Sequence, residues 1–270
     1  MLTERNITAV PTFEILCTTM HQCDFSKLKE MNIHSDIIYA NQASTTRYDE
    51  LKFESQIAKM ITTTTRGVGK NRNIAMIYAK ADICLLADDD MIFDDSIEQL
   101  VVQEFERLKK SDAIIFNVIS DNSDRGQVIN KKCKRMTKHS RNPYGAFRIA
   151  FKLNKIQKCN VWFSTMFGGG APYPSGEDSL FIRDMLYNGI KIYISDKIIG
   201  HVKQEGSTWF NGMNEEFFYG KGAFYKAVHP ETWPIWMLYF AWRTKKLSKM
   251  SYTEKIKCMK NGVHGYKDFH

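Results

Sequence analysis

Three consecutive aspartates, Asp88, Asp89 and Asp90, are the residues of this sequence best suited to chemistry. They follow the apolar run 83–87, and ligands of open α/β sheets bind beyond the carboxyl ends of buried strands. Adjacent carboxylates repel one another unless a cation lies among them, and Mg²⁺ or Mn²⁺ bridges such oxygens to phosphate. The run therefore predicts a divalent metal site. An acidic turn before a helix is the simpler structural interpretation.

A loop with two glycines and several basic residues precedes the aspartates. Gly67 and Gly69 allow a tight turn before an expected helix, whose N-terminal N–H groups favour an anion. Arg66, Lys70 and Arg72 add positive charge suited to a diphosphate or to the aspartates. A solvated helix face is the alternative interpretation for these basic residues.

Together these residues resemble the signature of the family 2 glycosyltransferases, which have the GT-A fold. In that family a Gly-x-x-x-x-Arg-Asn helix opening precedes a strand that ends in an Asp-rich metal motif. The matching residues here are Gly67, Arg72, Asn73 and the aspartates at 88–90. The resemblance covers residues 13–90 and extends more loosely to 209. It implies an inverting transferase that uses Mn²⁺ or Mg²⁺ and a nucleotide-diphosphate sugar, a UDP-hexose or a UDP-N-acetylhexosamine.

The resemblance also indicates a catalytic base further along the chain. Glu177 and Asp178 stand at the start of an expected helix and look like the acidic motif that supplies the base in family 2 enzymes. An inverting transfer needs a carboxylate that takes the proton of the attacking hydroxyl. We expect Asp178 to be the base and Glu177 to be its alternate or an acceptor ligand. Helix capping is the structural alternative. The preceding Gly169 and Gly170 would let a sugar approach closely.

By the same resemblance, the ends of the first two strands hold the uridine. Here these ends carry Thr18 and Thr19, then Asn41 and Gln42, which depart from the usual pattern and leave the identity of the base open. The full nucleotide-sugar assignment is Thr18, Thr19, Asn41, Gln42, Arg66, Gly67, Lys70, Arg72, Asn73, Asp88 and Asp89.

Several metal and lid residues complete the expected site. Asp90 is the first choice as a metal ligand, and Asp88 is the second. His201 follows a strand where many GT-A enzymes have a third ligand, although a lone histidine is more often structural. A lid with Trp209 stacking on the sugar is one interpretation of the loop that includes Ser207, Thr208 and Trp209, and ordinary packing is the other.

The elements that would position these residues alternate between strands and helices. Short β-branched runs at 13–17, 36–40, 59–63 and 82–86 are interspersed with helical patterns at 24–31 and 70–80. Later patterns predict a helix from a capping box at 95–98, a strand at 112–118, ordered segments at 146–151 and 161–167, a helix at 178–187 and a strand at 190–195. The pattern predicts an α/β fold of the Rossmann-like GT-A type with a mainly parallel central sheet.

The chain as a whole predicts one large domain with an extension. Residues 1–225 would form the GT-A domain, with a nucleotide-sugar half at 1–118 and an acceptor half at 145–225; residues 226–270 would form a helical, basic extension. The formal charge of +8 indicates an anionic partner. Six scattered cysteines and the lack of an apolar opening segment favour a cytoplasmic protein with reduced thiols.

Two alternatives to the transferase remain open. A nucleotidyltransferase would be expected to carry a glycine-rich loop after the first strand, and residues 17–24 contain no glycine. A nucleic-acid-binding protein could use the basic region 120–144, which lacks the interleaved aromatics of a stacking platform, so we expect no nucleic acid.

The tail suggests a further partner. The aromatic run 233–242 is followed by Arg243, Lys245, Lys246 and Lys249, an order that resembles an interfacial helix on anionic lipid. Such a helix would suit peripheral attachment at the inner face of the cell membrane and a lipid-linked oligosaccharide or surface glycan as acceptor. A helix that covers the sheet is the alternative interpretation.

Overall fold

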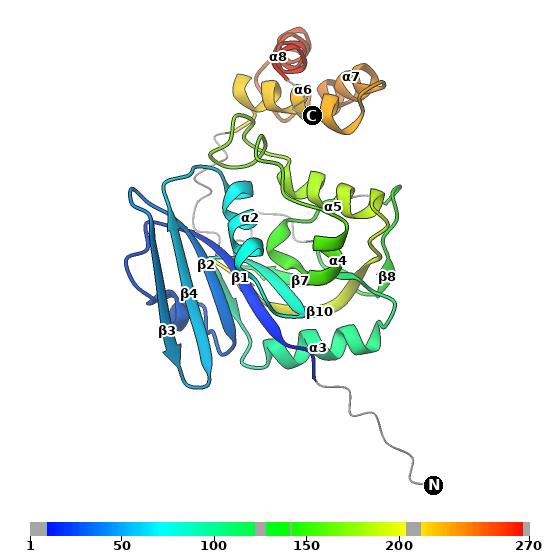
Figure 1. Cartoon of the computed structure of the whole chain (residues 1–270). Helices are drawn as coiled ribbons and strands as arrows, with labels where there is room; N and C mark the ends of the chain where they lie inside the picture. Colours follow the sequence, from blue (N-terminus) through cyan, green and yellow to red (C-terminus); the bar gives the residue numbers. More distant parts are fainter. Residues whose placement is uncertain (1–9, 122–127, 141, 204–211, 267–270) are drawn as a thin grey trace.

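A mixed sheet of ten strands forms the centre of the protein (Figure 1). The structure is a computed structural model, and it describes residues 10–121, 128–140, 142–203 and 212–266. The strand order is β3-β4-β2-β1-β5-β9-β7-β10-β6, with β8 paired to β10. The strands are β1 (Phe13–Met20), β2 (Asp36–Gln42), β3 (Arg47–Phe53), β4 (Gln56–Thr63), β5 (Ile83–Asp88), β6 (Met91–Phe93), β7 (Ala113–Ser120), β8 (Lys134–Arg135), β9 (Ile149–Lys152) and β10 (Ile192–Val202).

The half of the sheet nearest the aspartates is parallel, as the sequence predicts. Strands β4, β2, β1 and β5 are neighbours in parallel register, so that Thr18 of β1 lies beside Asp88 of β5. Because parallel strands end at the same edge, the polar residues at their carboxyl ends gather there. These strands are almost continuously apolar, since helices cover both faces of the sheet.

The sheet also contains antiparallel pairs, at both of its edges and around β9, that the sequence pattern did not predict. Strand β9 runs antiparallel between β5 and β7, and β3, β6 and β8 pair antiparallel with β4, β10 and β10. Strand β3 is exposed along most of its length, which is why its polar sequence gave no strand signal. The ordered segment expected at 161–167 forms a loop, with a bridge from Phe167 to Tyr173.

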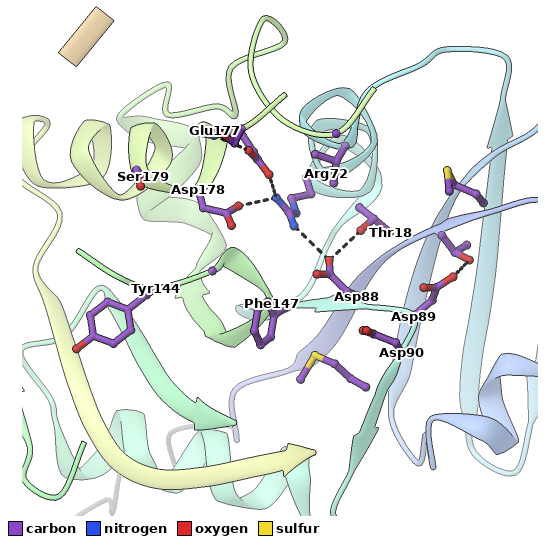
Figure 2. A pocket seen from close by; sticks show the side chains of 18 of the residues that line it. Thr18, Arg72, Asp88, Asp89, Asp90, Tyr144, Phe147, Glu177, Asp178 and Ser179 are labelled. Atoms are coloured by element: carbon purple, nitrogen blue, oxygen red, sulfur yellow. Dashed lines mark hydrogen bonds and ion pairs between the residues drawn. The ribbon is translucent and has the colours of Figure 1, made fainter. Parts of the chain in front are cut away.

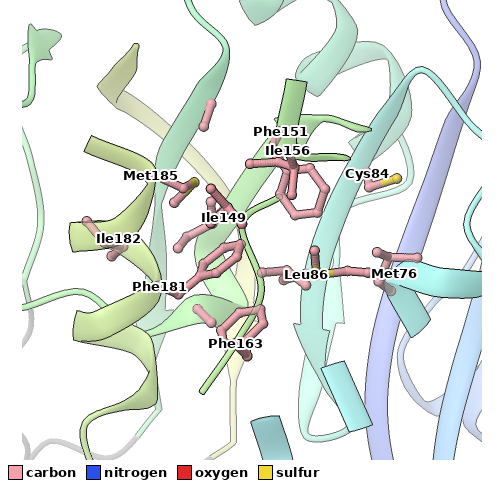
Figure 3. Close-up of a cluster of buried hydrophobic side chains, with 14 of the residues drawn as sticks. Met76, Cys84, Leu86, Ile149, Phe151, Ile156, Phe163, Phe181, Ile182 and Met185 are labelled. Atoms are coloured by element: carbon pink, nitrogen blue, oxygen red, sulfur yellow. The ribbon is translucent and has the colours of Figure 1, made fainter. Parts of the chain in front are cut away.

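Helices lie on both faces of the sheet. They are α1 (Lys27–Glu30), α2 (Val68–Tyr78), α3 (Ile97–Arg107), α4 (Leu153–Lys158) and α5 (Glu177–Tyr187), with a 3₁₀ turn at Ala146–Arg148. One apolar cluster joins α2 and α5 to one face through residues such as Met76, Leu86 and Phe181 (Figure 3). Another cluster joins α3 to the opposite face through Val101 and Phe105.

The start of α3 differs from its expected form. Ser96 is the N-cap residue and makes no side-chain capping bond, so the capping box expected at Asp95 and Glu98 does not form. Asp95 instead accepts a hydrogen bond of 2.8 Å from Asn32 Nδ2. The Asp95 side chain therefore bonds to a distant residue, Asn32, and does not cap the helix.

Three C-terminal helices pack on one another at one end of the molecule (Figure 1). They are α6 (Glu215–Val228), α7 (Trp233–Arg243) and α8 (Tyr252–Gly265). Gly222 and Gly262 let α6 and α8 approach closely, because a Cβ at Gly222 would lie 1.9 Å from the Met259 carbonyl oxygen. The border expected between residues 225 and 226 falls inside α6, and the division into domains stays a prediction. None of the described helices is long and apolar enough to cross a membrane.

Candidate active site

A cavity of about 950 Å³ opens at the carboxyl ends of β1 and β5. Polar side chains from several distant segments line it, and many of them carry charge. Those used below are Thr18, Thr19, Lys27, Gln42, Arg72, Asp88, Asp89, Asp90, Tyr144, Glu177, Asp178, Lys203 and Lys221. The sheet edge therefore brings together the two acidic motifs that the sequence separates by nearly 90 residues.

Arg72 of α2 connects these motifs (Figure 2). Its Nη1 atom donates to Asp178 Oδ1 at 2.7 Å and to Glu177 Oε1 at 3.3 Å. Its Nη2 atom donates to Asp88 Oδ1 at 3.2 Å. The guanidinium is buried and lies over the Phe163 ring, and the carboxylates around it raise its pKa against the effect of desolvation. One buried cation thus holds three carboxylates together.

The three aspartates occupy the turn between β5 and β6. Asp88 ends β5 and accepts a second hydrogen bond from Thr18 Oγ1 at 3.2 Å, and Asp89 accepts one from Thr19 Oγ1. The backbone carbonyl of Asp90 accepts from the Lys203 N–H at 3.1 Å. The hydroxyls of β1 therefore orient the first two aspartates toward the cavity.

Asp178 lies in the first turn of α5 and is poised to exchange a proton near neutral pH. Desolvation raises its pKa to about 7, with a further contribution from Glu177 that outweighs the lowering by Arg72. About 26% of its side chain remains exposed, so that a ligand can reach it. A carboxyl group with this pKa suits a general base.

A family comparison identifies what kind of protein has this arrangement. The model described as "Glycosyl transferase family 2" matches residues 27–167, more than half of the chain. The chain belongs to glycosyltransferase family 2. This membership favours a glycosyltransferase over the nucleotidyltransferase and nucleic-acid-binding alternatives. Comparison with curated proteins found no match.

Solved structures of TarS from S. aureus share the fold. TarS residues 1–349 superpose with a TM-score of 0.55 at 15% identity, covering 93% of this chain and 70% of that one. The same fragment in complex with UDP-GlcNAc gives a TM-score of 0.57, again at 15% identity, with 93% and 71% coverage. A longer TarS structure gives 0.56 at 16% identity, covering 96% of this chain and 44% of that one. The likeness confirms the GT-A fold of the family 2 glycosyltransferase.

The helix that carries Arg72 in the glycosyltransferase does not present an open anion site at its N-terminus. The Gly67 N–H donates to Gln42 Oε1, and the Val68 N–H donates to the Gly169 carbonyl, both at 2.9 Å. Arg66 and Lys70 are exposed and do not line the cavity. In this arrangement Gln42 and the loop at 168–170 bind the first N–H groups of the helix, and the expected binding of a diphosphate by Arg66, Lys70 and the helix N-terminus stays a prediction.

Two amide side chains expected at the nucleotide bond to the backbone of other segments. Asn41 is buried and bonds to both backbone groups of Gln22 at 2.9 and 3.1 Å. Asn73 makes a closed pair of 2.9 Å hydrogen bonds with the backbone of Phe163. Neither Asn41 nor Asn73 is among the cavity residues, whereas Thr18 and Thr19 do line the cavity, and the nucleotide contacts of all four stay a prediction.

His201, the expected third metal ligand, contacts Asp121, and its role at a metal stays a prediction. His201 on β10 has Nδ1 3.5 Å from Asp121 Oδ1 and is not among the cavity residues. Val202, the next residue and the last of β10, is buried, and Lys203 just beyond the strand lines the cavity. Ser207, Thr208 and Trp209, assigned to a lid, lie outside the described residues.

The aspartates fit a divalent cation by chemistry but do not form a complete cage. Asp88 and Asp90 supply the oxygen ligands that Mg²⁺ and Mn²⁺ prefer, and both line the cavity. Within the described ranges, no three acidic, histidine or cysteine side chains are arranged to hold an ion. A cation at this place would need additional oxygens, such as those of a bound diphosphate.

Several cavity residues gave no signal in the sequence. Lys221 comes from α6, near the end of the expected acceptor half at 145–225, and Lys27 comes from the short α1. Tyr144 comes from the basic region 120–144, where its hydroxyl donates to Asn130 Oδ1 at 2.9 Å. Isolated lysines and tyrosines carry no spacing pattern, so only the fold brings them to the cavity.

The loop before the acidic pair depends on Gly168, and Gly168→Ala is expected to destabilise the protein by about 2–4 kcal/mol. Its φ is +106°, and a Cβ there would lie 2.7 Å from Val68 Cγ1 and 2.8 Å from Glu177 Cδ. Gly189→Ala is the matched control, because Gly189 has a φ of +82° and open space around it. Chemical denaturation of both variants measures the difference, and equal losses would show that the overlap with Glu177 is unimportant.

Proposed function

We propose that this glycosyltransferase transfers a hexose or an N-acetylhexosamine from a UDP-sugar to an acceptor hydroxyl with inversion. The observation that carries the proposal is the link through Arg72 between the strand-end Asp88 and the helix-start Asp178. That link puts a carboxylate with a raised pKa across one cavity from the acidic turn. TarS, which shares the fold, has been solved with UDP-GlcNAc and with UDP, which supports the choice of donor.

The donor would lie between the strand ends and the aspartates. Thr18, Thr19 and Gln42 line that side of the cavity and offer hydroxyl and amide groups to the nucleotide. Asp88 and Asp90 would hold Mn²⁺ or Mg²⁺ beside the diphosphate. When bound, such an ion supplies positive charge to the leaving group.

Asp178 would act on the acceptor. The acceptor oxygen forms the new bond to C1 of the sugar while the bond from C1 to the diphosphate oxygen breaks. The proton of the hydroxyl passes to the Asp178 carboxylate, which must be ionised to accept it. Glu177 is placed differently, because it bonds to Arg72 and to the Gly176 N–H, and would hold Arg72 rather than take the proton.

Lys221 would contribute a cation to the substrate from the C-terminal helices. Its Nζ lies over the Phe217 and Phe224 rings at 5.4 and 5.2 Å, and burial lowers its pKa. Among the described residues, Lys221 Nζ has no hydrogen-bond partner and no carboxylate close enough to form a salt bridge. A desolvated ammonium with no close counter-ion favours an anionic ligand, here the diphosphate.

Lys221→Met is expected to weaken binding of UDP about 10–100-fold, since a charge-assisted contact is worth about 1.5–3 kcal/mol. Lys226→Met is the matched control on the same helix, where the lysine bonds to the Pro230 carbonyl and does not line the cavity. Calorimetric titration with UDP measures both variants. The same UDP affinity in Lys221→Met as in Lys226→Met would remove Lys221 from the donor site.

A growing surface glycan or a lipid-linked oligosaccharide supplies the hydroxyl, and the enzyme would act in the cytoplasm. A screen of UDP-sugars for hydrolysis, with the released sugar followed by proton NMR, tests the proposal. We expect one α-linked UDP-sugar to release the β-anomer first; initial release of the α-anomer would contradict inversion.

A further inference from the structure

Helix α7 is apolar on every side, which is unusual for a helix at the surface of a protein. Between Trp233 and Trp242 the helix contains no charged residue. A surface helix normally turns polar residues to water and apolar ones to the core. The outer side of α7 therefore needs a separate explanation.

The inner side of α7 is already used for packing. Met237 and Ala241, one helical turn apart, are buried against Phe218 and Met259 of the neighbouring helices. At its C-terminal end, buried Lys255 donates to the Thr244 carbonyl at 2.9 Å. These contacts fix which side of α7 faces outward.

The outer side carries large apolar residues. Trp242 is 59% exposed and Ile235 is 67% exposed, and Trp236, Leu238 and Tyr239 lie with them on the same side. Three of the rings follow one another, with centroids 6.4 Å apart from Trp236 to Tyr239 and 6.3 Å from Tyr239 to Trp242. Leu247, just past the helix, is 64% exposed and continues the apolar surface. An apolar patch of this kind marks an interaction site.

Positive charge borders this apolar side. Arg243, Lys245, Lys246 and Lys249 follow directly and are all exposed. Residues 232–253 include no aspartate or glutamate. Lys245 also lies over the Trp242 ring, with Nζ 5.7 Å from the centroid, so that the charged and apolar parts are contiguous.

We propose that the outer side of α7 docks on an anionic lipid surface. Tryptophan and tyrosine rings suit the headgroup level of a bilayer, and lysines beside them are attracted to anionic lipids. At 11 residues α7 would be about 16 Å long, too short to span a bilayer core of about 30 Å, so it would lie in the plane of the interface. A second copy of the chain is a poorer partner, because like charges would meet across a symmetric contact.

Vesicle flotation of the full chain tests the proposal. The probe vesicles are phosphatidylcholine alone and phosphatidylcholine mixed with phosphatidylglycerol. We expect binding only to the anionic vesicles, and weaker binding at high salt. Neutralising Lys245 and Lys246 together as Lys245→Gln and Lys246→Gln should reduce partition about 30-fold, given about 1 kcal/mol for each lysine. Lys109→Gln with Lys110→Gln, two exposed lysines after α3, is the matched charge control and should leave partition unchanged.

The apolar part is tested with Tyr239→Ser and Trp242→Ser together. This variant should lose vesicle binding, whereas Tyr48→Ser with Leu51→Ser on the exposed strand β3 should retain it. Thermal unfolding checks that all variants fold, which is expected because each changed side chain is exposed. The proposal would be overturned if the variant at Tyr239 and Trp242, or the variant at Lys245 and Lys246, bound anionic vesicles as well as the wild type does. So would failure of the wild type to bind anionic vesicles, or a concentration-dependent dimer that the changes at 239 and 242 abolish.

Discussion

Asp178→Asn is expected to lower kcat for sugar transfer by about 10²–10⁴-fold, the usual contribution of a general base. The substitution keeps the shape of the side chain and can keep a contact to Arg72, but an amide cannot accept the acceptor proton. UDP affinity should stay within about twofold of the wild-type value, because the change removes an interaction of the transition state and not of the donor complex. Steady-state kinetics and UDP titration measure the two effects separately.

The same residue sets the expected pH dependence of the wild-type enzyme. Since the Asp178 pKa is raised to about 7, the carboxyl is protonated below that pH and cannot act as a base. kcat/KM should therefore rise with pH and level off above about 7, with the ascending limb reporting this pKa in the free enzyme. A profile that is flat between about pH 5.5 and 8 would contradict the assignment of the base.

Glu177→Gln is the matched control for Asp178→Asn. Both residues contact Arg72 Nη1, at 3.3 Å for Glu177 and 2.7 Å for Asp178. If Asp178 is the base, the Glu177 variant keeps the ascending pH limb even where its turnover is reduced. If Glu177→Gln lost the ascending limb while Asp178→Asn kept turnover near the wild-type value, Glu177 and not Asp178 would be the base.

Arg72→Met is expected to be among the most destabilising substitutions in the protein, with a loss of about 3 kcal/mol at pH 7.5. Removing one partner of a buried ion pair costs about 3–5 kcal/mol, and the lower value applies because Asp88 and Asp178 are partly exposed. Transfer should also be lost, since Arg72 holds both acidic motifs. Arg72→Lys should recover little, because one ammonium cannot replace two separate guanidinium nitrogens.

The loss in Arg72→Met should grow as the pH rises. Without the guanidinium the pKa of Asp178 rises further in the folded state, whereas in the unfolded chain it stays near its ordinary value. The folded state then binds protons more tightly than the unfolded state, so its stability falls as pH increases through that interval. Denaturation at about pH 5 and 8 measures this; a difference from wild type that does not widen with pH would contradict it. Arg47→Met, which removes an exposed pair with Asp49, is the control and should cost no more than about 1 kcal/mol.

The sequence was sufficient for the parts of the fold with a strong local pattern. Strands β1, β2 and β5 are buried apolar runs, and polar residues at their ends mark the sheet edge where Thr18 and Asp88 meet. The start of α5 was also clear, because acidic residues after glycines are typical of a helix N-terminus. Pattern and burial agree in these elements, so the acidic motifs could be placed.

The individual amide and basic side chains could not be placed in the same way. Asn41 and Asn73 have the residue types of ligand-binding groups, yet both satisfy backbone groups of other segments. Arg66 and Lys70 lie in the loop and helix that lead to Arg72, but only Arg72 turns inward. Contacts between segments far apart in the sequence decide whether each of these side chains faces the cavity, and the local sequence does not predict such contacts. Lys221 is the opposite case, since the fold alone brings it to the cavity.

Calorimetric titration of UDP with and without Mn²⁺, on the wild type and on Asp90→Ala, tests the account most directly. Asp90 lines the cavity beside Asp88, where an ion shared with the diphosphate would link metal to nucleotide. We expect Mn²⁺ to tighten UDP binding to the wild type at least about tenfold and to have little effect on UDP binding to Asp90→Ala. UDP affinity that is the same with and without Mn²⁺, or an equal gain in both proteins, would contradict a donor site built on these aspartates.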